Sequence, residues 1–109
     1  MAAKMDMGME EATSPATMKA AFAEFVATML FVFVGVGAIV AALVSAGYPD
    51  VAARPDLVVL IAIAHGVMIG LLAAGIGPIS GGFINPAVTF AFIITGQISV
   101  AKGVVFIVA

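Results

Sequence analysis

The residues with the clearest chemical potential lie in one short stretch after the middle of the chain. Asn85 stands directly before Pro86, and the preceding segment contains Ser80, Gly81 and Gly82. Asn accepts a hydrogen bond at the start of a helix and Pro fits the first helical position, so the pair predicts that a helix begins here. Ser and paired Gly allow a tight, non-helical backbone ahead of it. Because the surrounding tract is uncharged and apolar, we expect this helix to start at membrane depth.

An irregular backbone inside a membrane needs a special environment. Lipid cannot satisfy free N–H and C=O groups, so a non-helical segment occurs there only where protein buries it or where it lines a water-filled cavity. The start of a helix also carries a positive partial charge of roughly half an elementary charge, which would orient water and repel cations in a pore. The stretch therefore favours a pore or a binding site. The alternative is that Asn85 only caps a buried helix.

Two other side chains could act inside the apolar tracts. Glu24 is the one acidic residue that a helical interpretation places within the membrane, where carboxylates are costly and usually functional. Its alternative is an interfacial position, since Lys19 precedes it closely. His65 is the single histidine, and it would either line a pore or donate a hydrogen bond in helix packing. Neither has a second carboxylate or a Ser/His/Asp grouping beside it in sequence, so we expect no enzymatic activity.

The composition is that of a membrane protein. Of the 109 residues, 64% are hydrophobic and 9% charged, whereas soluble domains carry roughly 25% charged residues. Residues 25–49 and 57–101 contain no Lys, Arg, Asp or Glu, and each tract can hold a span of about 20 residues. Cys is absent, and the alternating Met5, Met7 and Met9 have no His or Cys beside them, so we expect no metal site and no cofactor. The net charge of −2 gives no support for nucleic-acid binding.

The breaks between apolar runs predict the elements that must position these residues. We expect an all-α membrane domain over residues 18–109, after a flexible amino-terminal tail over residues 1–17. In chain order its parts are two transmembrane helices, a re-entrant loop, a half-helix and the start of a further transmembrane helix, over about residues 18–46, 57–74, 75–85, 86–95 and from about 100. Thr17 is the expected cap of the first helix, and Gly75 and Pro78 are the signals that end the second.

The central stretch resembles the signature of the major intrinsic proteins, the aquaporin family. The first half of these proteins carries a Ser-Gly-Gly-x-x-Asn-Pro-Ala-Val-Thr loop and half-helix, and residues 80–89 match each specified position. Residues 23–25 (Ala-Glu-Phe) and 96–99 (Gly-Gln-Ile-Ser) are also similar to the family's pattern. Within the family, residues 64–66 (Ala-His-Gly) resemble the plant tonoplast intrinsic proteins. The resemblance covers residues 20–109 and implies a partial aquaporin-like fold.

The resemblance implies a role for each of the singled-out residues. Asn85, Pro86 and Ala87 would form one Asn-Pro-Ala motif of the pore, and His65 would lie in its narrow selectivity constriction.

The same resemblance implies how the re-entrant loop is held. Glu24 would accept hydrogen bonds from the loop backbone and so keep the pore lining in place, and Ser80, Gly81 and Gly82 would shape that loop.

The function implied by the resemblance is passive transport of water and small neutral solutes. Intact family members are homotetramers in a lipid bilayer, and the vacuolar membrane is the expected location, with the plasma membrane as the alternative. The sequence contains no second Asn-Pro-Ala motif and no arginine suited to a selectivity filter. We therefore expect a truncated channel that does not conduct alone. The second hypothesis is a non-conducting partner that regulates full-length aquaporins.

Overall fold

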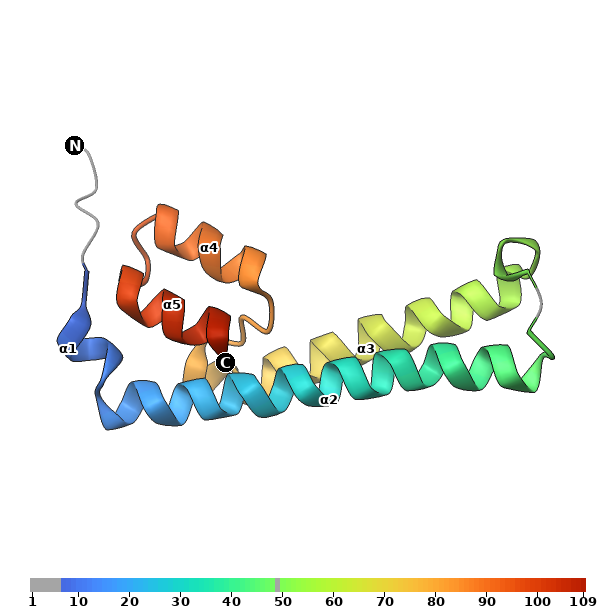
Figure 1. Ribbon diagram of the computed structural model, residues 1–109, viewed down its shortest axis with the longest axis horizontal. Coiled ribbons are helices and arrows are strands. Elements are labelled where there is room, and N and C mark those ends of the chain that lie inside the picture. The colour runs from blue at the N-terminus through green and yellow to red at the C-terminus, as the bar shows by residue number, and fades with distance from the viewer. Residues whose placement is uncertain (1–6, 49) are drawn as a thin grey trace.

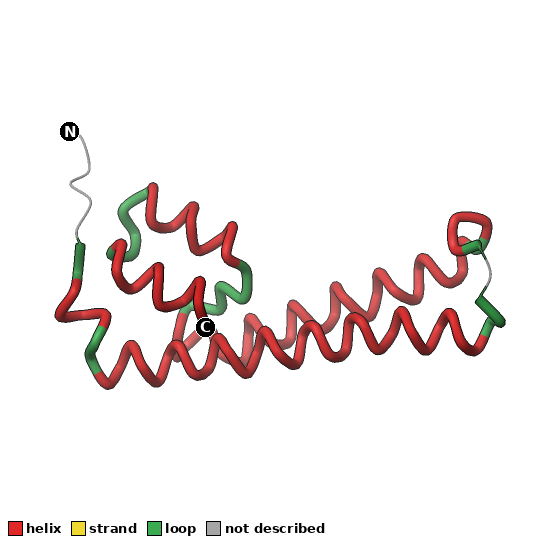
Figure 2. The backbone as a smooth tube through the Cα atoms, in the orientation of Figure 1, coloured by secondary structure: helices red, strands yellow, loops and turns green. Residues whose placement is uncertain are grey.

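The computed structural model describes residues 7–48 and 50–109, and the described residues form helices and connecting turns without a strand. Two long helices lie side by side and run in opposite directions, and two short helices lie together beside one end of this pair (Figure 1; Figure 2). The long pair gives the molecule its length of 53 Å. The described elements are all helical, as predicted for an all-α membrane domain.

The first long helix, α2, covers Pro15–Ser45 and follows the single turn of α1, Met9–Ala12. Ser14 is the cap of α2, because its Oγ accepts a hydrogen bond from the N–H of Thr17 at 3.2 Å. Pro15 occupies the first helical position, where its missing N–H costs nothing. The helix predicted from residue 18 thus begins one turn earlier, and the residue that caps it is Ser14 instead of Thr17.

The second long helix, α3, covers Pro55–Ser80 and extends past the end predicted at residue 74. Pro78 lies inside its last turn. The helix ends at Gly81, whose φ of 106° is a left-handed conformation that glycine adopts readily. A proline removes one helical hydrogen bond, but in an apolar segment the neighbouring N–H and C=O groups are best satisfied by continuing the helix. The irregular segment predicted over residues 75–85 is therefore confined to residues 81–85.

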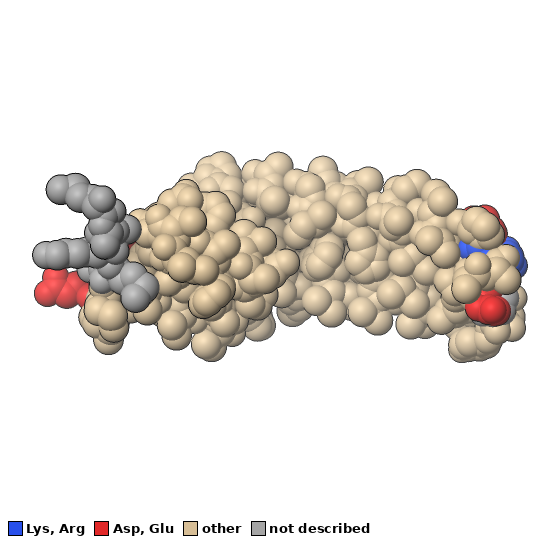
Figure 3. Space-filling model, turned by 90° about the horizontal axis from the view of Figure 1, so that it is seen from above, with Lys and Arg blue, Asp and Glu red and all other residues tan. Residues whose placement is uncertain are grey.

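The connection between the long helices is short and polar. It contains the 3-10 turn η1, Val51–Ala53, which Asp50 caps by accepting a hydrogen bond from the N–H of Ala52 at 3.0 Å. Arg54 then forms an ion pair with Asp56 at 2.6 Å at the start of α3. Figure 3 shows charged side chains at both ends of the long axis and uncharged surface between them on this face.

Two short helices complete the fold. α4, Pro86–Ile94, corresponds to the half-helix predicted over residues 86–95, and α5, Val100–Val108, corresponds to the segment predicted from about residue 100. The two helices pack directly against each other (Figure 1). Gly103 makes this approach close, because a Cβ at that position would clash with the side chain of Ile93. α5 also contacts α2, which fixes the short pair beside the long pair.

The segment predicted as a flexible tail divides into two parts. Residues 1–6, which include Met5, lie outside the described residues. The remainder contacts α5: Glu11 accepts hydrogen bonds from the Lys102 ammonium at 2.9 Å and from the Ser99 hydroxyl at 3.0 Å. The Met7 carbonyl also accepts a hydrogen bond from the N–H of Ala101 at 2.9 Å. The described part of the tail therefore has fixed partners close to the carboxyl end of the chain.

The long helices leave most of their large apolar side chains uncovered. Phe33 on α2 is 76% exposed and Leu71 on α3 is 65% exposed. Both helices are long and apolar enough to cross a membrane. An apolar surface of this extent requires lipid or further protein against it.

Candidate functional site

The turn between α3 and α4 covers residues 81–85, and glycine is required in it. Gly81 and Gly82 have φ values of 106° and 71°, which other residue types adopt only at a cost. A Cβ on Gly82 would also lie 2.7 Å from the carbonyl oxygen of Ala73 on α3. The turn therefore folds back against α3 at a distance that leaves no room for a side chain at residue 82.

A strained residue follows the glycines. Ile84 has a φ of 47° although it is β-branched, and its side chain is buried with 5% exposure. A backbone of this kind costs about 1–3 kcal/mol and persists only when the surrounding structure imposes it. The contacts of Ile84 must therefore supply the free energy that holds it.

Glu24 supplies the main contacts that hold the turn. Its side chain is 2% exposed, and Oε1 accepts hydrogen bonds from the Ser80 hydroxyl at 2.5 Å and from the Phe83 N–H at 2.9 Å. Oε2 accepts a third hydrogen bond, from the Ile84 N–H at 2.7 Å. A buried carboxylate is costly unless donors surround it, so these three bonds satisfy Glu24 and fix the turn at the same time.

Ser80 links the end of α3 to the turn. Its hydroxyl donates to Glu24 and accepts a hydrogen bond from the N–H of Gly82 at 3.1 Å. The N–H of Gly81 donates to the Gly77 carbonyl at 2.9 Å. With the two bonds to Glu24, all four N–H groups of residues 81–84 have partners, so this non-helical segment satisfies its donors without water.

Phe83 anchors the turn to the short helices. Its ring lies 5.0 Å from the ring of Phe92 on α4 and 5.5 Å from that of Phe106 on α5, and it packs on the buried cluster formed by Ala20, Ala21 and Phe106. This anchoring role of Phe83 is not predictable from the sequence alone. Its partners are distant in the chain, and no local spacing indicates them.

Asn85 begins α4 with its side chain in a fixed orientation. Its Oδ1 accepts a hydrogen bond from the N–H of Ala87 at 2.9 Å, and its carbonyl accepts from the N–H of Thr89 at 3.0 Å. Pro86 occupies the first helical position. Asn85 is exposed, and its Nδ2 has no hydrogen-bond partner among the described residues. The amide therefore presents two N–H donors at the surface.

His65 lies apart from this group, in the middle of α3. Its Nδ1 is 2.8 Å from the carbonyl oxygen of Ile61, and its ring meets the ring of Phe31 on α2 edge to face at 5.9 Å. Ser80 ends the same helix about 22 Å farther along its axis, at about 1.5 Å per residue. The structure thus brings Glu24 and Ser80 together with the turn, places Asn85 directly after them, and leaves His65 outside this hydrogen-bonded group.

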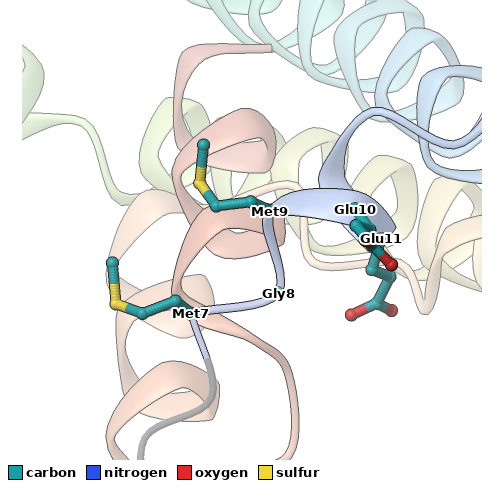
Figure 4. A pocket seen from close by; sticks show the side chains of 5 residues that line it. All are labelled: Met7, Gly8, Met9, Glu10 and Glu11. Carbon is teal, nitrogen blue, oxygen red and sulfur yellow. The ribbon is translucent and has the colours of Figure 1, made fainter.

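Two hollows lie at the amino-terminal end of the described chain, away from the turn. One has a volume of about 460 Å³; the side chains of Met7 and Met9 extend to one side of it and those of Glu10 and Glu11 to the other (Figure 4). The second, about 400 Å³, has walls formed mostly by apolar side chains of α1 and α5. Within residues 7–48 and 50–109, no group of three or more His, Cys, Asp or Glu side chains is arranged to hold a metal ion.

Comparison with known protein families identifies the family to which the chain belongs. Residues 11–109 match the major intrinsic protein family. The chain belongs to this family. It is therefore an integral membrane protein, and among the described residues α2 and α3 are the two transmembrane helices.

Individual members of the major intrinsic protein family are similar over most of the chain. Aquaporin-5 of Ovis aries is 42% identical over 100 residues, which cover 92% of this chain and 34% of the relative. Probable aquaporin TIP3-2 of Arabidopsis thaliana is 41% identical over 105 residues, covering 92% of this chain and 39% of the relative. The lens fiber major intrinsic protein of Lithobates pipiens is 42% identical over 91 residues, which cover 84% of this chain and 31% of the relative. The chain thus spans about a third of the length of these relatives.

Proposed function

We propose that these residues form one half of an aquaporin-type pore, in which the amide of Asn85 binds permeating water. The observation that carries the proposal is the fixed orientation of this side chain. Since the Ala87 N–H holds Oδ1, the two Nδ2 hydrogens remain available to donate to a water oxygen. Water bound in this way is oriented with its oxygen toward the start of α4, where the positive helix end opposes the entry of cations.

The hydrogen-bonded turn supports this role by positioning the start of α4. Glu24 holds the N–H groups of Phe83 and Ile84, and Ser80 holds that of Gly82. Because these donors are occupied by protein, the irregular segment can stay at membrane depth without hydration of its amides. In this proposal Pro86 and Ala87 complete the motif by starting the helix directly after Asn85.

The proposed permeants are water and small neutral solutes, since the exposed amide of Asn85 offers hydrogen bonds and carries no charge. His65 is proposed to contribute to the selectivity constriction, on the family resemblance of residues 64–66. The similarity to probable aquaporin TIP3-2 of Arabidopsis thaliana favours the vacuolar membrane, and the plasma membrane is the alternative, because the chain is about equally similar to aquaporin-5. Assembly as a homotetramer in the lipid bilayer, with a separate pore in each subunit, belongs to the same proposal. Neither an enzymatic role nor a cofactor is part of it.

We further propose that these 109 residues do not conduct alone. Two transmembrane helices and one half-helix of nine residues cannot enclose a continuous water path across about 30 Å of hydrocarbon. The exposed faces of α2 and α3 need further protein on one side of the pore and lipid on the other.

The test joins the chain to the remainder of a full-length aquaporin. In a chimera, residues 11–109 replace the matching third of the Arabidopsis thaliana relative, and stopped-flow shrinkage of proteoliposomes measures water permeability. We expect permeability well above that of empty vesicles, a loss of most of it on Asn85→Ala, and no rise for the 109-residue chain alone. Gln97→Ala is the matched control, because Gln97 carries an exposed amide in the turn after α4. A chimera that conducts equally with Asn85→Ala would overturn the proposal.

A second candidate is a non-conducting partner of full-length aquaporins. The uncovered apolar side chains of α2 and α3, such as Phe33 and Leu71, favour it because they could pack against another channel subunit. Co-purification from detergent of the tagged chain with a co-expressed full-length aquaporin tests this candidate. Absence of the channel from the purified material at matched expression would exclude it.

A further inference from the structure

α2 and α3 are in close contact at Gly35 and His65. Gly35 is buried, and a Cβ at this position would lie 2.6 Å from Nε2 of His65 and 2.9 Å from its Cδ2. A Cβ atom essentially never lies closer than 3.0 Å to a heavy atom of such a neighbour, so one of the two residues would have to move. Gly37, one further glycine of α2, has nothing within 4 Å of the corresponding point. The imidazole edge therefore occupies the space that a side chain at residue 35 would need.

The opposite edge of the imidazole is fixed by α3 itself. Nδ1 of His65 lies 2.8 Å from the carbonyl oxygen of Ile61, one turn earlier in the helix. A carbonyl can only accept, so Nδ1 carries the hydrogen and donates it. In the neutral ring, Nε2 is then an acceptor. Phe31, one turn before Gly35 on α2, places its ring edge to face with the imidazole at an interplanar angle of 86°.

The remaining nitrogen stays open to the surface. Within the described residues, no buried side-chain nitrogen or oxygen lacks a hydrogen-bond partner, and Nε2 of His65 forms no such bond with them. Nε2 is therefore accessible, beside the backbone of Gly35. It offers one lone pair in a fixed place.

We infer that Gly35 is a positioning residue for His65. By lacking a side chain it admits the imidazole between α2 and α3, where Ile61 holds the tautomer that leaves Nε2 as an accessible hydrogen-bond acceptor. A neutral solute with a hydroxyl or amide N–H can donate to this nitrogen as it passes. The placement of the His65 ring by Gly35 (the positioning step) is argued from the contacts alone. The hydrogen bond from a passing solute to Nε2 (the solute step) rests on the proposed channel function.

The experiment uses the whole 109-residue chain in detergent micelles with ¹⁵N-labelled histidine. Because the chain contains a single histidine, the ¹⁵N spectrum reports only the two nitrogens of His65. We expect Nδ1 to appear protonated and Nε2 unprotonated at a pH where the ring is neutral. Gly35→Ala should convert this into a mixture of tautomers, and Gly37→Ala should leave the spectrum unchanged. An unchanged spectrum with Gly35→Ala, or an Nε2-protonated ring in the unsubstituted chain, would overturn the inference.

Two further measurements distinguish the positioning effect from other outcomes. One addresses misfolding of the Gly35→Ala variant, and the other addresses failure of the proposed channel function. If Gly35→Ala lowers the helix content, the double variant G35A/H65A should restore it, because the clash needs the imidazole; failure to restore it contradicts the inference. In the chimera described above, Gly35→Ala should change the ratio of urea to water permeability severalfold, and Gly37→Ala should not. An unchanged ratio refutes the solute step, whereas a chimera that conducts nothing refutes the proposed function and leaves the ¹⁵N result standing.

Discussion

Glu24 and Ile84 are joined by a hydrogen bond of 2.7 Å, in which a buried carboxylate on α2 accepts from the N–H of a residue with a left-handed backbone. Sixty residues of sequence separate them. The bond makes the conformation of the turn before α4 depend on α2, so the position at which the half-helix starts is set by the first transmembrane helix as well as by α3.

Replacing Glu24 by Gln should loosen this turn. Gln keeps the shape but exchanges one acceptor oxygen for a donor, so at least one of the N–H groups of Phe83 and Ile84 loses its partner. Hydrogen bonds to charged groups contribute about 1.5–3 kcal/mol, and we expect a loss of this size in SDS-induced unfolding followed by circular dichroism. Glu10→Gln is the control, since Glu10 is exposed on α1. Equal unfolding midpoints for the two variants would contradict the role of Glu24.

Substitution of Gly82 by Ala should destabilise the protein, although Ala usually stabilises. The Cβ would lie 2.7 Å from the Ala73 carbonyl and the φ of 71° is unfavourable for Ala. Gly75 is the matched comparison, because it lies in α3 with nothing within 4 Å of a Cβ and does not directly precede a proline. There Ala should raise the stability by up to about 1 kcal/mol through its higher helix propensity. Thermal unfolding of both variants measures the difference, and the same sign for both would refute the close approach.

The ion pair between Glu11 and Lys102 should make the stability of the packing between the amino-terminal segment and α5 depend on pH. The hydrogen bond from Lys102, followed by that from Ser99, lowers the pKa of Glu11 below its ordinary value. A lowered pKa stabilises the folded state above the ordinary carboxyl pKa, and this stabilisation is lost as the pH falls through the lowered value. As the pair is partly exposed, its contribution is about 0.2–1 kcal/mol.

Titration of the Glu11 carboxyl by NMR checks this expectation. Lys102→Met should raise the pKa of Glu11 toward its ordinary value, and the stability difference from the unsubstituted chain should shrink at acidic pH. Lys19→Met serves as the control, since Lys19 forms no ion pair within the described residues. A Glu11 pKa unaffected by Lys102→Met would show that the contact does not persist in solution.

Asn85 should act as a helix cap independently of any transport. Asn85→Ala removes the acceptor for the Ala87 N–H, which should cost about 1 kcal/mol and speed hydrogen exchange at that amide. Asn85→Asp retains an oxygen acceptor and should keep the Ala87 amide protected. Amide exchange in micelles compares the two variants. Equal protection of Ala87 in both would mean that the side-chain bond does not order the start of α4.

The features predicted from sequence are those with local causes. The cap at Asn85 with Pro86 at the first helical position depends on adjacent residues, and α4 begins where this chemistry indicates. The apolar run around Glu24 is also local, and it left a position within the membrane and an interfacial position both open. Of the three hydrogen-bond donors to Glu24, the N–H groups of Phe83 and Ile84 lie in the turn, and the Ser80 hydroxyl lies at the end of α3.

The features that local patterns missed have distant or competing causes. Pro78 and the glycines before it are usual helix breakers, but in α3 the need to satisfy apolar backbone outweighs them until Gly81 turns the chain. The contacts of Phe83 and the ion pair of Glu11 join segments far apart in sequence. No propensity of single residues encodes such pairs, since they depend on how the helices pack.

The unequal charge-free lengths of the two long helices have a consequence for the bilayer. At a rise of about 1.5 Å per residue, residues 25–45 of α2 extend about 31 Å and residues 57–80 of α3 about 36 Å. A typical hydrocarbon layer of about 30 Å matches the first and is shorter than the second. α3 must therefore tilt more than α2 in a thin bilayer, and a thicker bilayer would relieve this hydrophobic mismatch. The length of the lipid chains therefore affects the tilt of α3, and with it the orientation of the turn that leads into α4.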